Sequence, residues 1–387
     1  MKPSLIALQA ITSHSTNANT SINTLALNLK MDRNYSTLLD FSRFIAAFLV
    51  FIHHTEQIFK DNRLSPLASF GHDSVIFFFI LSGFVIGFVS EIKENTLQKY
   101  ATARLARLYS VAIPSLLSSF FLVWVGSLYF PEDYSKFLNE NWFYVILNAL
   151  FFVNQSWIGG IEIPTNGPYW SVCYEAWYYV LFGISFYLSG SVRIALLLLA
   201  SSLAGPRIIL LMPIWLIGFA FYRLHKSLKQ RKIFGYFCII ASTSFYLIFR
   251  INNWDDSLFS YSASWAGGEI KINTTLGFSK RFAPDFIIST LFIMTLYGLL
   301  MVHTDFTTPL NKMRPAIRFF SSYTFSLYLL HFPILIFISH LTNNTWVALI
   351  SCLCIIVVIG YFTEIRKKNL SFLIEHTFNF LKPKPVV

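Results

Sequence analysis

An arginine and a histidine on one apolar stretch are the residues of this chain best suited to chemistry. Arg43 and His54 lie in the segment 38–59, which is long and apolar enough to cross a bilayer. Arg43 and His54 are eleven positions apart, and in an α-helix this spacing turns back to within about 20° of the same face and rises roughly 16 Å. Ionisable groups in a membrane helix are costly and usually face the bundle interior. We therefore expect Arg43 and His54 to line one polar passage.

A histidine in a polar cavity suits general-base chemistry, because its unperturbed pKa of about 6.5 lets it accept a proton near neutral pH. The structural alternative is a histidine that bonds to a neighbouring helix and an arginine that reaches the interface. His53 lies about 80° round the helix from the shared face, so His54 is the expected partner of Arg43.

Two later segments add polar side chains to apolar runs. Ser82 and Gly83 close the aromatic run 77–81, where small residues either let helices pack closely or line a substrate path. Arg104 and Arg107 lie three residues apart and share a helix face. They can clamp phosphates through forked hydrogen bonds, or serve as ordinary positive charge beside a membrane helix.

Two further segments carry an acid and a second histidine. The stretch 168–175 opens a long helix, with Ser171 as its expected N-cap and Glu175 within the first turn. Glu175 either complements the positive helix end or orients and stabilises His54. His331 lies mid-membrane beside a proline, where a backbone hydrogen bond is the structural alternative to a functional role.

Composition indicates an integral membrane protein. Of 387 residues, 55% are hydrophobic and only 13% are charged, against about 25% charged in a soluble domain. The net charge is +11, and the lysines and arginines lie in short loops between apolar runs, as the positive-inside rule expects for a membrane protein. We therefore expect no nucleic-acid partner. The four cysteines lie in or at the ends of apolar segments and show no metal-ligand spacing, so we expect no metal site.

Eleven apolar runs predict the architecture. Two of them, 142–156 and 192–204, are shorter than the roughly 20 residues that a crossing needs. We predict an all-α, polytopic membrane helix bundle of about ten transmembrane helices plus one short re-entrant or interfacial segment. The runs lie at about 41–59, 72–90, 109–130, 142–156, 173–190, 192–204, 207–224, 233–250, 284–303, 319–341 and 345–363.

Charge asymmetry orients this bundle. Lysine and arginine concentrate in the loops 91–108, 223–232 and 304–318 and in the tail after residue 363, which places them on the cytoplasmic side. The loop 131–140 carries three acids against one lysine and is expected outside. Both termini are then cytoplasmic.

The two short runs leave an alternative in the topology. If 142–156 does not cross, the stretch 157–172 lies outside; if 192–204 does not cross, that stretch lies inside. The first choice is favoured, because it puts a loop without Lys or Arg outside and Arg193 inside. The loop 251–283 falls on the outer side, where it is placed to cap a site or contact an acceptor.

Five stretches, taken in order, resemble the acyltransferase-3 family of bacterial integral-membrane acyltransferases. The resemblance runs from about residue 38 to 363, with Val172 in place of the usual leucine and His53 beside the expected histidine. We accordingly divide the chain into a flexible N-terminal tail at 1–37, a membrane acyltransferase domain at 38–363 and a cytoplasmic C-terminal tail at 364–387. Met31 is an alternative start. The five stretches are Arg43…His54, Phe77–Gly83, Arg104 with Arg107, Trp170-Ser171-Val172…Glu175 and Tyr328-Leu-Leu-His331.

The resemblance implies an O-acetyltransferase of the bacterial inner membrane that moves acetyl from acetyl-CoA to a hydroxyl of a cell-surface polysaccharide, glycolipid or oligosaccharide. On this hypothesis His54 and Glu175 are catalytic. The acyl donor is bound by Arg43, Ser82, Arg104 and Arg107, and the acceptor is contacted by Trp170 and His331. The alternative is a proton-coupled transporter or flippase for a glycolipid or small solute, with the histidine and glutamate as proton relays. The sequence shows no inverted repeat, which disfavours transport.

Overall fold

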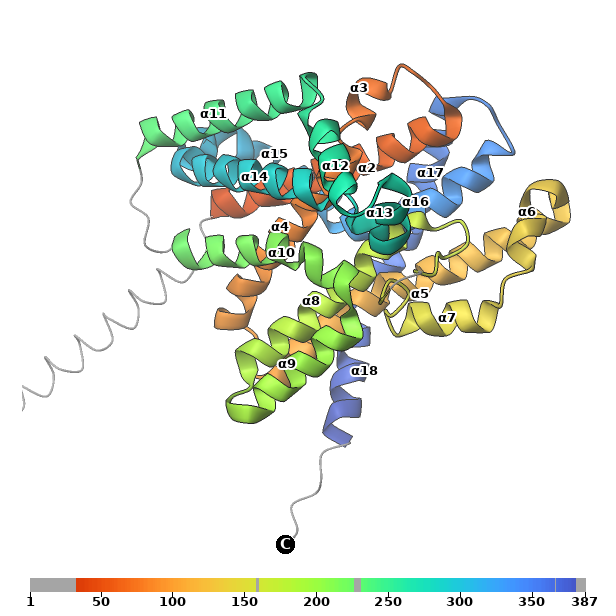
Figure 1. The fold of residues 1–387 in the computed structure, drawn as a ribbon, viewed down its shortest axis with the longest axis horizontal. Coiled ribbons are helices and arrows are strands. Elements are labelled where there is room, and N and C mark those ends of the chain that lie inside the picture. The colour runs from red at the N-terminus through yellow and green to blue at the C-terminus, as the bar shows by residue number, and fades with distance from the viewer. Residues whose placement is uncertain (1–32, 158–159, 226–230, 366, 381–387) are drawn as a thin grey trace, which may run out of the picture.

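Helices account for every regular element in the part of the chain that the structure describes. This computed structural model covers residues 33–157, 160–225, 231–365 and 367–380 (Figure 1). The all-α fold class is as predicted. The elements are α2 (Arg33–Phe59), α3 (Ser65–Ala68), α4 (Gly71–Ile92), α5 (Leu97–Tyr129), α6 (Pro131–Leu138), α7 (Trp142–Leu150), η1 (Gly167–Tyr169), α8 (Trp170–Tyr187), α9 (Gly190–Ala204), α10 (Pro206–His225), α11 (Lys232–Ile251), α12 (Trp254–Trp265), α13 (Glu269–Leu276), η2 (Gly277–Ser279), α14 (Phe282–Val302), η3 (His303–Phe306), α15 (Thr307–Ser322), α16 (Thr324–Ser339), α17 (Thr345–Gly360), η4 (Tyr361–Ile365) and α18 (Lys367–Phe380).

Several of these helices are long enough to cross a bilayer. Within the described ranges, seven are long and apolar enough, and the pair α15–α16, bent by 49°, makes an eighth. The number ten stays a prediction, which requires the 18-residue α8 and the 15-residue α9 to cross as well. Helix α7 has 9 residues and so spans only about 14 Å. It is too short to cross, which agrees with 142–156 as the non-crossing run.

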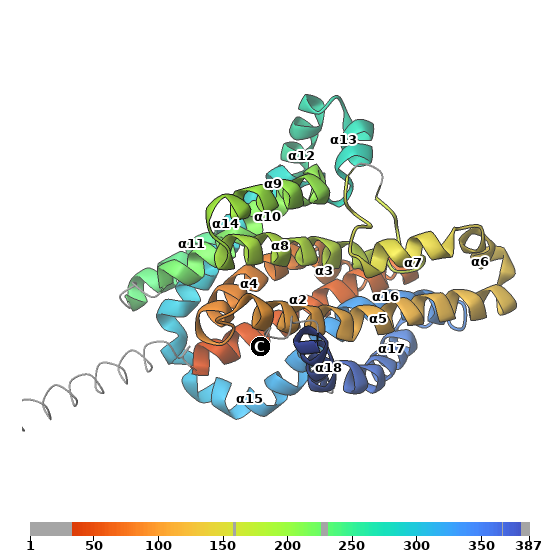
Figure 2. The same ribbon diagram turned by 90° about the horizontal axis from the view of Figure 1, so that it is seen from below.

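Ion pairs group the basic loops at one end of the bundle. Arg223 bonds to Glu91 at 2.7 Å, and Lys232 pairs with Asp305. The ends of α4 and α10 therefore meet, and so do the start of α11 and the turn η3 (His303–Phe306) after α14. Helix α11 starts at this end and leads to α12 and α13, which stand out from one side of the bundle (Figure 2). The side of the membrane that each end faces stays a prediction.

The chain ends differ from the expected tails. Helix α2 begins at Arg33, so residues 33–37 belong to the first helix rather than to a tail. The rest of that tail and Met31 lie outside the described residues. The segment expected as a C-terminal tail contains α18, which packs on α5 and projects from the bundle (Figure 1).

Close backbone contact between α4 and α10 fixes one wall of the site. A Cβ on Gly83 would lie 2.0 Å from the carbonyl oxygen of Trp215, and one on Gly218 would lie 2.0 Å from that of Ile80. Only glycine allows the two helices to approach this closely. The neighbouring Ser82 points into a cavity instead. Gly83 thus serves the close packing of the helices, and the substrate role of Ser82 stays a prediction.

Candidate active site

A cavity between α2, α4, α5, α8 and α16 gathers side chains from all five sequence motifs. Its volume is about 800 Å³, including its open mouth. The four residues expected to bind the acyl donor, which come from three helices, all line it. We call this the arginine cavity. Its polar lining consists of Arg43, Ser82, Arg104, Arg107, Ser171, Glu175, Tyr179, Thr324 and Tyr328.

The arginines of this cavity are held by aromatic rings and by acids outside its lining. Arg104 bonds to Glu94 at 2.5 Å, and its guanidinium lies 5.5 Å from the centre of the Tyr179 ring. Burial raises the pKa of the Glu94 carboxyl, and the charge of Arg104 opposes this rise. Arg107 lies 5.4 Å from the ring of Phe325. Such cation–π contacts hold the planar guanidinium groups while leaving N–H groups to bind an anion.

Glu175 is the acidic residue in the lining of this cavity. Ser82 donates to its Oε1 at 2.7 Å, Tyr179 donates to the same oxygen, and the Trp215 indole N–H donates to Ser82 at 3.1 Å. A buried carboxylate is costly unless it is paired, and nearby guanidinium groups offset that cost. Glu175 is therefore fixed as the counter-ion of the cavity.

The expected contact between Glu175 and His54 is corrected by these bonds. The hydrogen bonds of Glu175 go to Ser82 and Tyr179, while His54 bonds to His331. The predicted topology placed Glu175 and His54 towards the same side of the membrane. It did not predict how deep in the bundle Glu175 lies, and the structure places it with the cavity arginines that stabilise its charge.

The start of α8 also differs from expectation. The N-cap is Tyr169, which makes no side-chain cap bond, because the 3-10 turn η1 leads into the helix. Ser171 lies inside the helix, where its hydroxyl bonds to the Pro168 carbonyl at 3.2 Å and lies 2.8 Å from the Tyr328 hydroxyl. This last contact joins two motifs, on α8 and α16, at the inner end of the arginine cavity.

The histidine pair determines the protonation of His54. Nδ1 of His331 lies 2.7 Å from the Leu327 carbonyl oxygen, and its Nε2 lies 2.8 Å from Nδ1 of His54. A carbonyl only accepts, so in a neutral pair the His331 proton is on Nδ1 and its Nε2 accepts from His54. This assignment, made from the bonding pattern, leaves Nε2 of His54 unprotonated. His54 is therefore arranged as a base, and His331 fixes its tautomer.

The adjacent His53 is engaged in structure. Its Nδ1 lies 2.8 Å from the Ala68 carbonyl oxygen and its Nε2 lies 3.1 Å from the Gln57 amide. A Cβ on Gly71 would come within 2.3 Å of it, so the start of α4 packs directly on this imidazole. Both ring nitrogens are occupied. The choice of His54 over His53 agrees with the helix geometry.

The cavity leads towards the histidine pair without including it. Thr324 and Tyr328 line the cavity, and His331 continues the same face of α16 one turn further on. The Tyr328 and His331 rings are 6.4 Å apart. On α2, Arg43 lines the cavity and His54 faces α16. The stripe predicted from Arg43 to His54 thus runs along the inside of the bundle.

Trp170, which was expected to contact the acceptor, lies outside the cavity lining. Its ring stacks on Phe278 of η2, with centroids 4.7 Å apart and planes 2° from parallel, and it is buried. Trp170 therefore joins α8 to the segment that follows α13.

Sequence reasoning missed Tyr179. This tyrosine lies four residues after Glu175, and its ring and hydroxyl contact both Arg104 and Glu175. The signal that could have found it is the i, i+4 spacing, which puts the two side chains on one face of α8.

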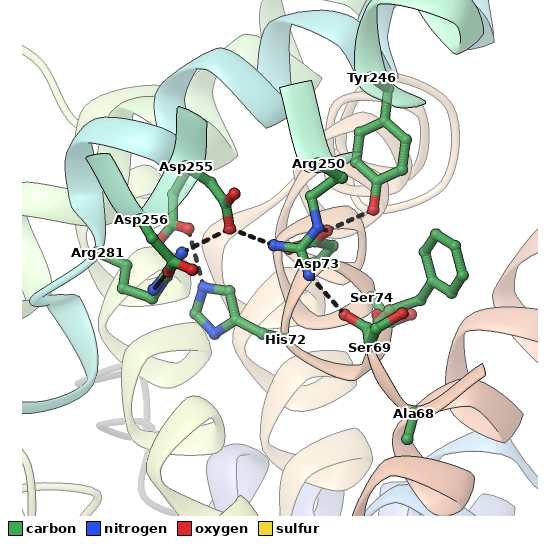
Figure 3. Close-up of polar contacts among 12 residues, drawn as sticks. Ala68, Ser69, His72, Asp73, Ser74, Tyr246, Arg250, Asp255, Asp256 and Arg281 are labelled. Carbon is green, nitrogen blue, oxygen red and sulfur yellow. Dashed lines mark hydrogen bonds and ion pairs between the residues drawn. The ribbon is translucent and has the colours of Figure 1, made fainter. Parts of the chain in front are cut away.

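A second polar cluster fastens the 251–283 insert to the bundle (Figure 3). Arg281 bonds to Asp255 at 2.8 Å and to Asp256 at 2.9 Å, and Arg250 also pairs with Asp255. We call this the insert network. Its remaining contacts are His72 with Asp285, Tyr246 with Asp73, and Arg250 with the Ser69 carbonyl oxygen.

Comparison with protein families places the chain. Residues 37–364 match the acyltransferase-3 family, described as an acyltransferase domain. The chain belongs to this family. No curated protein and no solved structure gave a match. The resemblance seen in the five motifs is confirmed, and this acyltransferase is a multi-pass membrane protein. The family assignment favours the enzyme over the transporter alternative.

Proposed function

We propose that this acyltransferase moves acetyl from acetyl-CoA to a hydroxyl of a cell-surface polysaccharide, glycolipid or oligosaccharide. One observation carries the proposal: the lining of a cavity with three arginines ends on α16 one turn from His331, which bonds to a histidine whose Nε2 is free to accept a proton. Its arginines suit the phosphates of a CoA thioester, and its base suits activation of a hydroxyl.

The acyl donor would enter at the arginine end. Among the lining residues, Arg43, Arg104 and Arg107 face the single carboxylate of Glu175, while Asp40 and Glu94 outside the lining pair with Arg43 and Arg104. The Arg107 guanidinium would then be the main group for phosphates. Ser82 would border the path of the pantetheine arm. Arg43 and His54 stand roughly 16 Å apart along α2, and this is the depth that the arm must cover.

The acceptor would react at the histidine pair. Nε2 of His54 takes the proton of the acceptor hydroxyl while its oxygen attacks the thioester carbonyl. The departing thiolate then takes the proton from His54. General-base help of this kind contributes about 10²–10⁴ in rate. His331 is a positioning residue, because it keeps the His54 proton on Nδ1.

The charge distribution supports an orientation in the bacterial inner membrane. We place the arginine end and both termini in the cytoplasm, where acetyl-CoA is made, and the 251–283 insert on the outer side. The basic loops that meet at the bundle end of Arg223 and Lys232 would then be cytoplasmic, as the positive-inside rule requires.

Mass spectrometry of surface glycans tests this proposal. Cells with the wild-type gene should carry glycans heavier by one or more acetyl groups than cells with the gene deleted or with His54→Ala. Cells with His53→Gln are the matched control and should keep the acetyl groups. Identical glycans in all four strains would overturn the proposed substrate class.

A further inference from the structure

We infer that Tyr328 stabilises the oxyanion that forms during acyl transfer. The inference rests on the proposed function, because the oxyanion is that of the thioester carbonyl. Nothing above assigns a group to this charge. Tyr328 lines the cavity from α16, one helical turn from His331, and Arg107 packs on Phe325 one turn in the other direction along α16.

The hydroxyl groups that line the cavity differ in what holds their protons. Ser82 and Tyr179 donate to the carboxylate of Glu175. Thr324 donates to the Ser321 carbonyl at 2.9 Å. Carboxylate and carbonyl oxygens are strong acceptors, so the protons of these three hydroxyls are not available to a further acceptor.

Tyr328 is the exception within this lining. We assign the Ser171 proton to the Pro168 carbonyl, 3.2 Å away, because a carbonyl oxygen only accepts. With this assignment, the Tyr328 hydroxyl is the donor in the 2.8 Å contact with Ser171. Its proton is thus held by a neutral hydroxyl oxygen. A hydrogen bond to an anion is roughly twice as strong as one between neutral groups. Redirecting this proton from Ser171 to an oxyanion is therefore favourable.

Packing fixes the place of the Tyr328 ring. Phe78 contacts it edge to face with centroids 5.7 Å apart, and the residue is 7% exposed. A small rotation of the O–H bond redirects the proton while the ring stays where it is. The hydroxyl is a preorganised donor on a ring that lies 6.4 Å from the ring of His331, the partner of the base.

The step balances as follows. The acceptor oxygen forms a bond to the thioester carbon while its proton moves to Nε2 of His54. The carbonyl oxygen becomes an oxyanion and accepts the Tyr328 O–H. The C–S bond then breaks, the carbonyl re-forms, and the thiolate takes the proton from His54. Tyr328 returns its hydrogen bond to Ser171.

The test is Tyr328→Phe in purified protein in nanodiscs, with kcat and the KM for acetyl-CoA measured separately. Losing one oxyanion donor costs about 10²–10³ in kcat, and the KM for acetyl-CoA should change little. The control is Tyr174→Phe on α8, which removes a buried hydroxyl that lies 2.8 Å from the Ser279 hydroxyl. This control keeps the wild-type kcat, because Tyr174 does not line the cavity.

Ser171→Ala separates catalysis from structure. If Tyr328 acts on the oxyanion, Ser171→Ala keeps most of the kcat, since the donor remains. Equal losses in Ser171→Ala and Tyr328→Phe would show that only their mutual bond matters, and would overturn the inference. So would a Tyr328→Phe enzyme with the wild-type kcat. A wild-type protein that transfers no acetyl from acetyl-CoA would instead overturn the proposed function.

Discussion

The arginine cavity and the insert network both gather charged residues inside the bundle, and they balance charge in different ways. In the cavity lining, three arginines surround one carboxylate, Glu175, which already accepts two hydroxyl protons. In the insert network, Arg250 and Arg281 share Asp255, and Arg281 also bonds to Asp256 (Figure 3). Two of these arginines also pair with acids outside the lining, Arg43 with Asp40 and Arg104 with Glu94. Arginines that line a hollow can bind an anionic ligand. Compensated charge between packed helices marks a scaffold.

The two adjacent histidines repeat this contrast at the scale of one residue. His53 gives one ring nitrogen to a backbone carbonyl and the other to Gln57. His54 gives one nitrogen to His331 and keeps a free lone pair. Both residues are histidines, so residue type does not show which one is the base. Their hydrogen-bond partners do, and these partners predict how a variant of each histidine behaves.

The largest effect is expected at His54. His54→Ala removes the base, so acetyl transfer should fall by about 10²–10⁴ while the protein remains folded and binds acetyl-CoA. Steady-state kinetics in nanodiscs measure this. The neighbouring His53→Gln should keep most of the activity and lose thermal stability, because its bond to Ala68 is structural. Equal activity losses in the two variants would break the contrast.

A variant of the insert network should lose stability instead. Asp255 is 3% exposed and holds two arginines, each about a quarter exposed. Asp255→Asn weakens the charge-assisted bonds to both arginines, while Arg250 keeps Asp73 at 3.8 Å and Arg281 keeps Asp256 at 2.9 Å. The change should therefore cost about 1.5–3 kcal/mol of stability. The midpoint of thermal unfolding in detergent should fall, with the KM for acetyl-CoA unchanged. A raised KM at wild-type stability would place this network in the binding site.

The cavity arginines should respond in the opposite way. Arg107→Gln removes charge-assisted hydrogen bonds to phosphate worth about 1.5–3 kcal/mol, which corresponds to a rise of about 10–100-fold in the KM for acetyl-CoA. Unfolding should change little. Arg281→Gln in the insert network is the matched control, and its KM should stay at the wild-type value. Equal KM values for both variants would contradict the assignment of the phosphate site.

The smallest effect is expected at the mouth of the cavity. Asp40 lies 3.6 Å from Arg43, and both side chains are about a quarter exposed. Such a pair is worth less than about 1 kcal/mol, so Asp40→Asn should change the KM for acetyl-CoA by no more than about fivefold. Titration of initial rates against acetyl-CoA measures this. A larger rise in the KM would show that acetyl-CoA binding depends on Asp40 holding Arg43 in place.

Features within one helix could be predicted from the sequence. The stripe from Arg43 to His54 follows from helix periodicity alone, and so does the shared face of Arg104 and Arg107. Hydropathy predicted the all-α bundle and the short run at 142–156, where α7 has 9 residues.

Contacts between helices could not be predicted in the same way. The partner of His54 is His331, 277 residues further along the chain, and that of Glu175 is Ser82. These contacts depend on the rotation and depth of each helix, which hydropathy does not encode. The insert network depends on the same variables. The family motifs predicted which residues belong to the site, but only helix packing determines which of these residues contact one another.

Calorimetric titration of acetyl-CoA into the purified protein in nanodiscs tests the central claim most directly. The claim is that the arginine cavity binds the acyl donor and leads its thioester to His54. Wild type and His54→Ala should bind with equal affinity, at concentrations in the usual range for enzyme substrates of about 1 μM to 1 mM. Arg107→Gln should bind at least about tenfold more weakly. No binding by the wild type, or unchanged binding by Arg107→Gln, would contradict the account.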